Sequence, residues 1–252
     1  MRLIHPVLVR GMRTNAMAVA LGMMVVGGTA LVLMSLLPAN RVAATALLGL
    51  SAALGFGVGG AMAWREAGAS RRRREEIGDD LARLLAPAFD DSYTLVLAPR
   101  LPGVTADLAA LLVGPAGVRA LIARRWRGRY RVRGRGWELD TGSRAGWIPT
   151  PTNPSFEADA VADAVGRWWR NALDDPTVGI TPAVAFPRPY STVVLEEPIG
   201  EIVTTDNAPW WAQSIGRVQR IDPHRAARFV EAVLSASEAE AMGARSTEPR
   251  IA

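Results

Sequence analysis

Two apolar runs joined by a glycine-rich turn decide the fold: Leu108-Ala-Ala-Leu-Leu-Val113, then Gly114-Pro-Ala-Gly117, then Val118-Arg-Ala-Leu-Ile-Ala123. Short apolar runs bounded by turn residues are typical of buried strands. We therefore predict two buried strands over 108–113 and 118–123, joined directly by this turn.

After these strands the chain turns at Trp126-Arg-Gly128 and then places arginine at every second position. Successive side chains of a strand point to opposite faces, so these arginines would share one face. They are Arg127, Arg129, Arg131, Arg133 and Arg135. No acidic residue lies between Val118 and Trp137, so this face requires an anionic partner or solvent.

The remaining soluble sequence alternates between strand-like and helix-like patterns. It predicts helices over 79–86, 156–173 and 223–236, and strands over 93–98, 180–186 and 202–205. Strands followed by alternating helices and strands predict an α/β (α+β) domain with a mixed central sheet flanked by helices. We assign residues 78–236 to this domain and expect the polar residues 237–252 to form a flexible tail.

Two long apolar segments precede the domain. Residues 16–37 and 42–64 carry no charged side chain, and each segment is long enough to cross a bilayer as a helix. Because only residues 38–41 separate them, we predict a transmembrane α-helical hairpin over 16–64. Glycines in both segments would let the two helices pack closely.

Basic residues flank this hairpin more than they occupy its turn, which contains only Arg41. Those that flank it most closely are Arg10 and Arg13, within the N-terminal segment 1–15, and Arg65. The positive-inside rule then predicts a multi-pass protein of a bacterial inner (plasma) membrane, with both termini and the domain in the cytoplasm.

A charged connector over 65–77 joins the hairpin to the domain. Its basic run is either a solvated helix or a contact with anionic lipid headgroups. The run consists of Arg71, Arg72, Arg73 and Arg74.

The overall composition excludes several kinds of chemistry. The chain has 252 residues, a net charge of +5 and no cysteine, so disulfides, thiolate nucleophiles and cysteine-based zinc sites are excluded. The two histidines, His5 and His224, lie too far apart in sequence to predict a metal-binding pair. The positive charge favours nucleic acid or an acidic lipid surface as a neighbour.

The order of the motifs resembles the nuclease-related domain (NERD) family of the restriction-endonuclease-like superfamily. The resemblance rests on residues 111–118, on 126–128, on Asn153-Pro154 before the long helix, on 181–186, and on the helix after Asp222-Pro223. It covers about residues 78–235. It implies a restriction-endonuclease-like fold and relatives that hold Mg²⁺ or Mn²⁺ with carboxylates for nuclease chemistry.

The resemblance also places the family's catalytic positions on residues that lack the required groups. The two metal-binding acids of the family fall at Ala109 and Ile122, and its lysine falls at Arg124. Ile122 has no oxygen to offer a hard cation, and Arg124 stays protonated and cannot serve as a base. Glu157 stands where the family often has a glutamine.

A displaced metal site is the alternative to this loss. Asp107 lies two residues before Ala109 and would share its face of a regular strand. Together with Asp79 or Asp80 from the first helix, Asp107 could supply carboxylate ligands.

The arginine-rich stretch admits three interpretations. Arginines interleaved with aromatic residues are typical of surfaces that bind phosphates and stack on bases. The same pattern is also typical of a strand with one solvated face, often at a sheet edge, and of a contact with anionic lipid. The candidate contact residues are Arg119, Arg124, Arg125, Trp126, Arg127, Arg129, Tyr130, Arg131, Arg133 and Arg135.

From the sequence we therefore expect a membrane-anchored NERD-like protein without catalytic activity, which binds nucleic acid or acts as a scaffold through its arginine-rich hairpin. We predict no cofactor and no metal site. Mg²⁺ or Mn²⁺ would be required only under a second hypothesis, an active or atypical nuclease. A third hypothesis is a structural or accessory subunit that docks with a membrane-protein partner through the glycine-rich helices.

Overall fold

The computed structural model describes residues 1–6, 69, 72–105, 107–173, 178–216 and 221–246. The chain divides into two compact units, one of Met1–Val7 with Arg74–Ala252 and one of Leu8–Arg73. The transmembrane hairpin predicted over 16–64 lies outside the described residues. Within the described part of the chain, no helix is long and apolar enough to cross a membrane.

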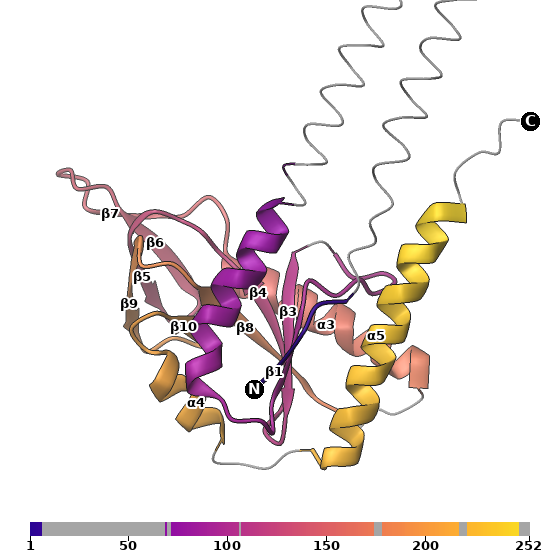
Figure 1. Cartoon of the computed structure of the whole chain (residues 1–252). Coiled ribbons are helices and arrows are strands. Elements are labelled where there is room, and N and C mark those ends of the chain that lie inside the picture. The colour runs from indigo at the N-terminus through magenta and orange to yellow at the C-terminus, as the bar shows by residue number, and fades with distance from the viewer. Residues whose placement is uncertain (7–68, 70–71, 106, 174–177, 217–220, 247–252) are drawn as a thin grey trace, which may run out of the picture. The chain divides into compact units, whose positions relative to one another are not determined.

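A six-stranded mixed sheet forms the centre of the first unit, in the order β1-β2-β3-β4-β8-β10 (Figure 1). Neighbours from β2 to β4 are antiparallel, whereas β1, β8 and β10 run parallel to their partners. The strands are β1 (Arg2–Ile4), β2 (Thr94–Leu97), β3 (Leu108–Gly114), β4 (Gly117–Ala123), β8 (Ile180–Phe186) and β10 (Glu201–Thr204). The predicted buried hairpin is thus confirmed as β3 and β4.

Helices cover both faces of this sheet. On one face lie α3 (Pro154–Leu173) and α5 (Pro223–Ser246), whose Trp169 and Phe229 rings are 4.6 Å apart between centroids. On the other face lie the helix over residues 72–85, the 3-10 turn η1 (Ala86–Ala88) and α4 (Ala208–Gly216), which bury Leu81 and Trp211. The predicted α/β class, with a mixed sheet flanked by helices, is confirmed.

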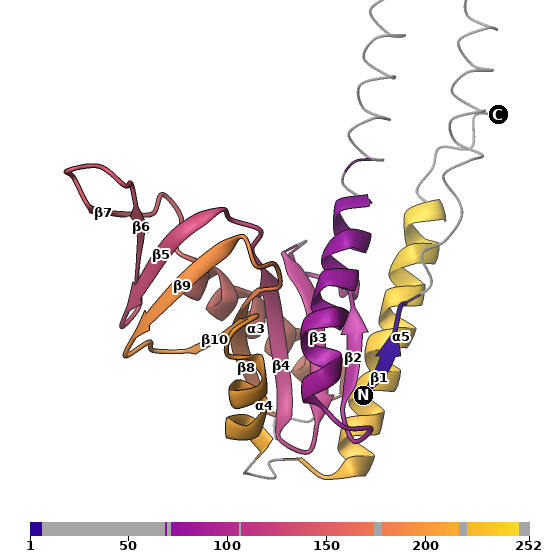
Figure 2. The ribbon, with the colours of Figure 1, turned by 60° about the vertical axis from the view of Figure 1, so that its left-hand side comes forward.

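A second sheet, in the order β7-β6-β5-β9, contains most of the alternating arginines (Figure 2). Its strands are β5 (Gly128–Arg133), β6 (Gly136–Asp140), β7 (Trp147–Pro149) and β9 (Ser191–Glu196). β4 leads into β5 and β8 leads into β9, so this sheet continues from the carboxyl ends of two parallel strands. Val132 and Trp137 on its inner face join the core on the α3 side.

Both ends of the domain differ from the prediction. Of the tail predicted over 237–252, residues 237–246 are helical, because α5 continues to Ser246, and residues 247–252 lie outside the described residues. The Ser237 hydroxyl is buried, donates to Val233 O at 2.7 Å and accepts from Arg100 N at 3.1 Å, which anchors this polar sequence. At the other end, residues 2–4 pair with β2 and belong to the central sheet.

Gly114 provides a test of the packing between β3 and the preceding segment. A Cβ at this position would overlap ring carbons of the buried Tyr93. Gly114→Ala should therefore lower the free energy of unfolding by about 1–3 kcal/mol, because the ring must move.

Gly179→Ala is the matched control, since a Cβ at Gly179 meets no atom within 4 Å. It should change the free energy of unfolding by about 0.5 kcal/mol or less. Denaturant titration measures the free energy of unfolding of both variants. Equal stability of the two variants would contradict the close contact between Gly114 and the Tyr93 ring.

Candidate anion-binding site

The arginine-rich strand β5 is an interior strand, not an edge, because β6 and β9 pair with it on either side. Its side chains alternate as the sequence predicts. Tyr130 and Val132 are buried on the inner face, whereas Arg129, Arg131 and Arg133 share the outer face. We call these three residues the arginine ladder.

Carboxylates from neighbouring strands neutralise the arginine ladder. Arg131 lies opposite Glu138 of β6, and its Nε donates to Glu138 Oε2 at 2.7 Å. Arg133 lies opposite Glu196 of β9 and donates to it from Nη2 at 2.7 Å. The hydrogen bond and charge of Glu196 raise the pKa of Arg133.

Two of the three remaining alternating arginines, Arg129 and Arg135, also have acidic partners. Arg129 Nη1 lies 3.5 Å from Asp140 Oδ2, and Arg135 Nη1 lies 2.7 Å from Asp159 Oδ2 of α3. The face therefore does not need an external anion for charge balance. Acids that the stretch itself lacks come from β6, β9 and α3.

The aromatic residues of the predicted stacking surface point inward. Trp126, Tyr130 and Trp137 pack against each other and Phe186, with Trp126–Tyr130 centroids 4.9 Å apart. Burial raises the pKa of the Tyr130 phenol, which donates to Arg127 O at 3.0 Å. Tyr130 is therefore a core residue that cannot stack on a base, and Trp126 is partly buried against the same core.

Arg119 is also placed inside the fold. Its side chain is 2% exposed, and Nε lies 3.3 Å from Glu201 Oε2 of β10. A guanidinium in this position cannot reach an external partner. The prediction that Arg119 contacts nucleic acid or lipid is therefore wrong.

A second group of arginines lies where β4 and β8 end, and we call it the strand-end cluster. At its centre is Asp80, which is 3% exposed and forms ion pairs with Arg83, Arg125 and Arg188. It consists of Arg83, Arg125 and Arg188 with the carboxylates of Glu76 and Asp80, together with Arg127, which lies beside Tyr190 two residues after Arg188.

Glu76, from the same helix as Asp80, accepts from Arg125 Nη1 at 2.9 Å and lies 3.7 Å from Arg188 Nη2. Arg127 forms no ion pair with any described residue and lies 5.6 Å from the ring centroid of Tyr190, which is 58% exposed. Three guanidinium groups thus share two carboxylates, and Arg127 adds a positive charge without a carboxylate partner among the described residues. The excess positive charge of the region lies here and not on the arginine ladder.

Arg125 has hydrogen-bond donors that the cluster does not use. Its Nη2 is 3.3 Å from Asp80 Oδ2, which is close enough for an ion pair, yet neither Nη2 nor Nε is directed at an acceptor. Buried donors without an acceptor are costly and occur at sites where a ligand or water completes the bonding. The carboxyl ends of parallel strands are also where open α/β sheets bind ligands.

The positions that the family resemblance marks as catalytic form a different arrangement. Arg124 forms an ion pair with Glu157 of α3, and Ile122 is fully buried in the core beneath it. Burial lowers the pKa of the Arg124 guanidinium from its ordinary value, while the charge of Asp107 opposes that shift. A β-bulge at Ala109 interrupts the alternation by which Asp107 would share its face.

The carboxylates proposed for a displaced metal site are not gathered together. Asp80 is surrounded by guanidinium groups, and Asp79 next to it is exposed. Over the described residues, no group of three or more acidic or histidine side chains could hold a metal ion.

The connector arginines are described only in part. Arg72, Arg73 and Arg74 are exposed, whereas Arg71 lies outside the described residues.

Comparisons with known proteins give no relative on which to base an assignment. A scan of protein-family models and searches of curated proteins and of solved structures find no match to this chain.

The sequence predicted the alternation of β5 but not the partners of its arginines. One of these partners could have been predicted from the sequence. A tight turn at Gly134-Arg135 pairs the strands on either side of it and so places Arg131 opposite Glu138. The pairing with Glu196 and the convergence on Asp80 join residues 63 and 108 positions apart, and no local pattern indicates them.

Asp80→Asn tests whether this carboxylate holds the strand-end cluster together. Removing its charge leaves three guanidinium groups short of a partner, so the free energy of unfolding should fall by about 2–4 kcal/mol. Asp79→Asn is the matched control, because Asp79 is exposed and forms no ion pair within the described part of the chain. Thermal and denaturant unfolding would measure the stability of both variants. An equal loss of unfolding free energy in the two variants would refute the central role of Asp80.

Proposed function

We propose that this domain binds nucleic acid through its phosphates at the strand-end cluster and does not cleave it. The observation that carries the proposal is the combination of excess positive charge with the unused donors of Arg125. Because Arg125 Nε and Nη2 are buried, a phosphate would give those donors an acceptor by displacing a side chain of the cluster. Arginine suits this task because its planar group forms two parallel hydrogen bonds with a phosphate.

The surroundings of the cluster support a polymer ligand. Tyr190 is an exposed ring beside Arg127, and a base could stack there next to a bound phosphate. Trp147 lies beneath Arg129 and Arg131, with their guanidinium carbons 5.4 and 4.7 Å from its centroid. The arginine ladder extends from the cluster, and its exposed ion pairs are weak enough to exchange carboxylate for phosphate.

The absence of hydrolysis is proposed from the family resemblance together with the geometry. In a NERD-like, restriction-endonuclease-like domain the position of Arg124 would belong to a lysine and that of Ile122 to an acid. Here Arg124 is held by Glu157, and Ile122 contributes to the core. We therefore propose a NERD-like domain that keeps affinity for a polyanion without a metal site.

We further propose that the protein is anchored in the bacterial inner membrane by residues 16–64. Residues before and after that segment belong to one compact unit, so the chain must leave the domain and return to it. Two spans joined by a short turn satisfy this requirement, and the positive-inside rule then places the domain in the cytoplasm. The basic connector would lie close to anionic lipid headgroups.

The binding proposal predicts that the affinity for DNA falls as salt is added. It also predicts that removing arginines from the strand-end cluster weakens binding more than removing arginines elsewhere. Arg127→Ser combined with Arg188→Ser should weaken binding of single- and double-stranded DNA roughly tenfold or more and reduce the salt slope by about 1.5–2. The measurement is fluorescence anisotropy with the full-length chain in mild detergent over a salt series. The matched control is Arg167→Ser with Arg170→Ser, exposed arginines of α3 that carry the same charge.

Four outcomes would contradict the proposal. Equal effects of the two double variants would show that only net charge matters. Cleavage of the DNA with Mn²⁺ in the same samples would support an atypical nuclease. Binding to anionic lipid nanodiscs without binding to DNA would assign the cluster to lipid, and binding to neither would favour a subunit of a membrane-protein complex.

A further inference from the structure

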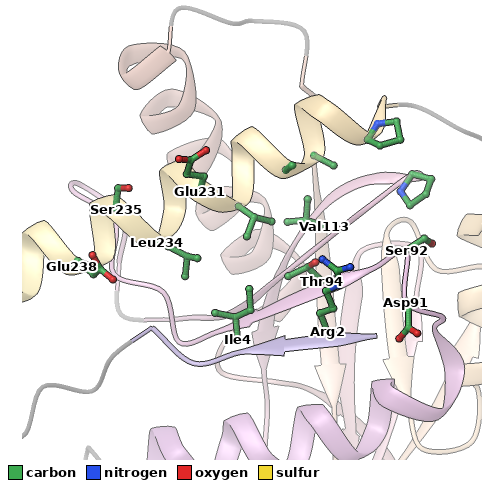
Figure 3. Close-up of a pocket in the computed structure, with 15 residues that line it drawn as sticks. Arg2, Ile4, Asp91, Ser92, Thr94, Val113, Glu231, Leu234, Ser235 and Glu238 are labelled. Atoms are coloured by element: carbon green, nitrogen blue, oxygen red, sulfur yellow. The ribbon is translucent and has the colours of Figure 1, made fainter.

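A groove runs along the edge strand β1, between it and α5, on the side of the sheet opposite the helix over 72–85 (Figure 3). Its volume is about 500 Å³. The walls are Ile4 of β1 and Val230 and Leu234 of α5, and the floor includes Val113 of β3. It is a separate feature from the strand-end cluster and has a mainly apolar interior.

The rim of this groove is acidic in an otherwise basic protein. Glu231 and Glu238 of α5 are exposed at the rim and form no ion pair with any described residue. Seven residues along a helix correspond to about 10 Å, so the two carboxylates lie on one side of α5. Asp91 at one end is neutralised by the Met1 amino group at 2.9 Å, and Arg2 is the one basic side chain in the lining.

The strand beside the groove has backbone groups directed away from the sheet. Arg2 N donates to Tyr93 O at 2.9 Å, so the backbone of Arg2 faces β2. Because the direction alternates along a strand, the N–H and C=O of Leu3 point away from β2, to a side on which no described strand lies. An edge strand with such groups can receive a further strand.

We propose that this groove binds an extended basic peptide, which adds a strand to the edge of β1. Small apolar side chains on one face of the peptide fill the space between Ile4, Val230 and Leu234. Arginine or lysine side chains on that same face of the peptide, on either side of the apolar ones, pair with Glu231 and Glu238 of α5. Charge complementarity favours this occupant over an acidic segment or a second copy of this basic chain.

The test uses the full-length chain in mild detergent and a fluorescein-labelled peptide, Thr-Arg-Thr-Val-Thr-Arg-Thr, whose two arginines and valine share one face of a strand. A peptide with glutamine in place of arginine should bind roughly tenfold more weakly. Glu231→Arg combined with Glu238→Arg should weaken binding of the basic peptide by a similar factor or more. Glu240→Arg, an exposed position of the same helix outside this groove, should leave the affinity within about twofold.

Hydrogen exchange separates strand addition from side-chain binding alone. Exchange at the Leu3 amide should slow when the basic peptide is bound, because that N–H gains an acceptor. Failure of the unchanged protein to bind the peptide, equal binding by the rim-reversed variant, or unaltered exchange at Leu3 would each overturn the proposal. None of these results depends on nucleic-acid binding at the strand-end cluster.

Discussion

The buried carboxylate of Asp80 is the interaction on which the site depends, because it joins three parts of the chain. Its oxygens bind Arg83 of its own helix, Arg125 after β4 and Arg188 after β8. Charges with so little exposure lose most of their hydration, and their mutual attraction repays that loss only when the geometry is well defined. The cluster therefore contributes less to net stability than to fixing where β4 and β8 end, and so where the second sheet begins.

The distribution of acids then decides which arginines can attract a ligand. On β5 each arginine of the ladder has a carboxylate from a neighbouring strand, so the outer face carries little net charge despite its composition. Such cross-strand pairs are worth about 0.2–1 kcal/mol each and stabilise the register of β5. At the strand ends, Arg125, Arg127 and Arg188 outnumber the acids. The arginine-rich composition of one strand was thus a poor guide to where charge accumulates, because neutralisation takes place between strands.

Local sequence predicted those parts of the fold that local physics controls. The apolar runs of β3, β4 and β8 and the amphipathic pattern of α3 were found because burial leaves a direct mark on the sequence. β1 was missed, since a strand of three residues has no detectable period and acquires its structure only by pairing with β2. The bulge at Ala109 and the ion pairs of Asp80 likewise arise from contacts between distant segments. The site was therefore less predictable than the core that supports it.

The pairing of β1 with β2 connects the groove to the proposed membrane hairpin. Three residues in a parallel pair add little stability by themselves, and closing a long loop opposes the pairing. If residues 16–64 form a transmembrane hairpin, that hairpin returns the chain close to its starting point before β1 joins the sheet. Folding of the hairpin in the membrane would then already have reduced the conformational entropy that pairing β1 with β2 must otherwise remove. Under that proposal, the pairing of β1 with β2 would be most stable when the hairpin is assembled, and peptide binding at the groove would then depend on the anchored state of the chain.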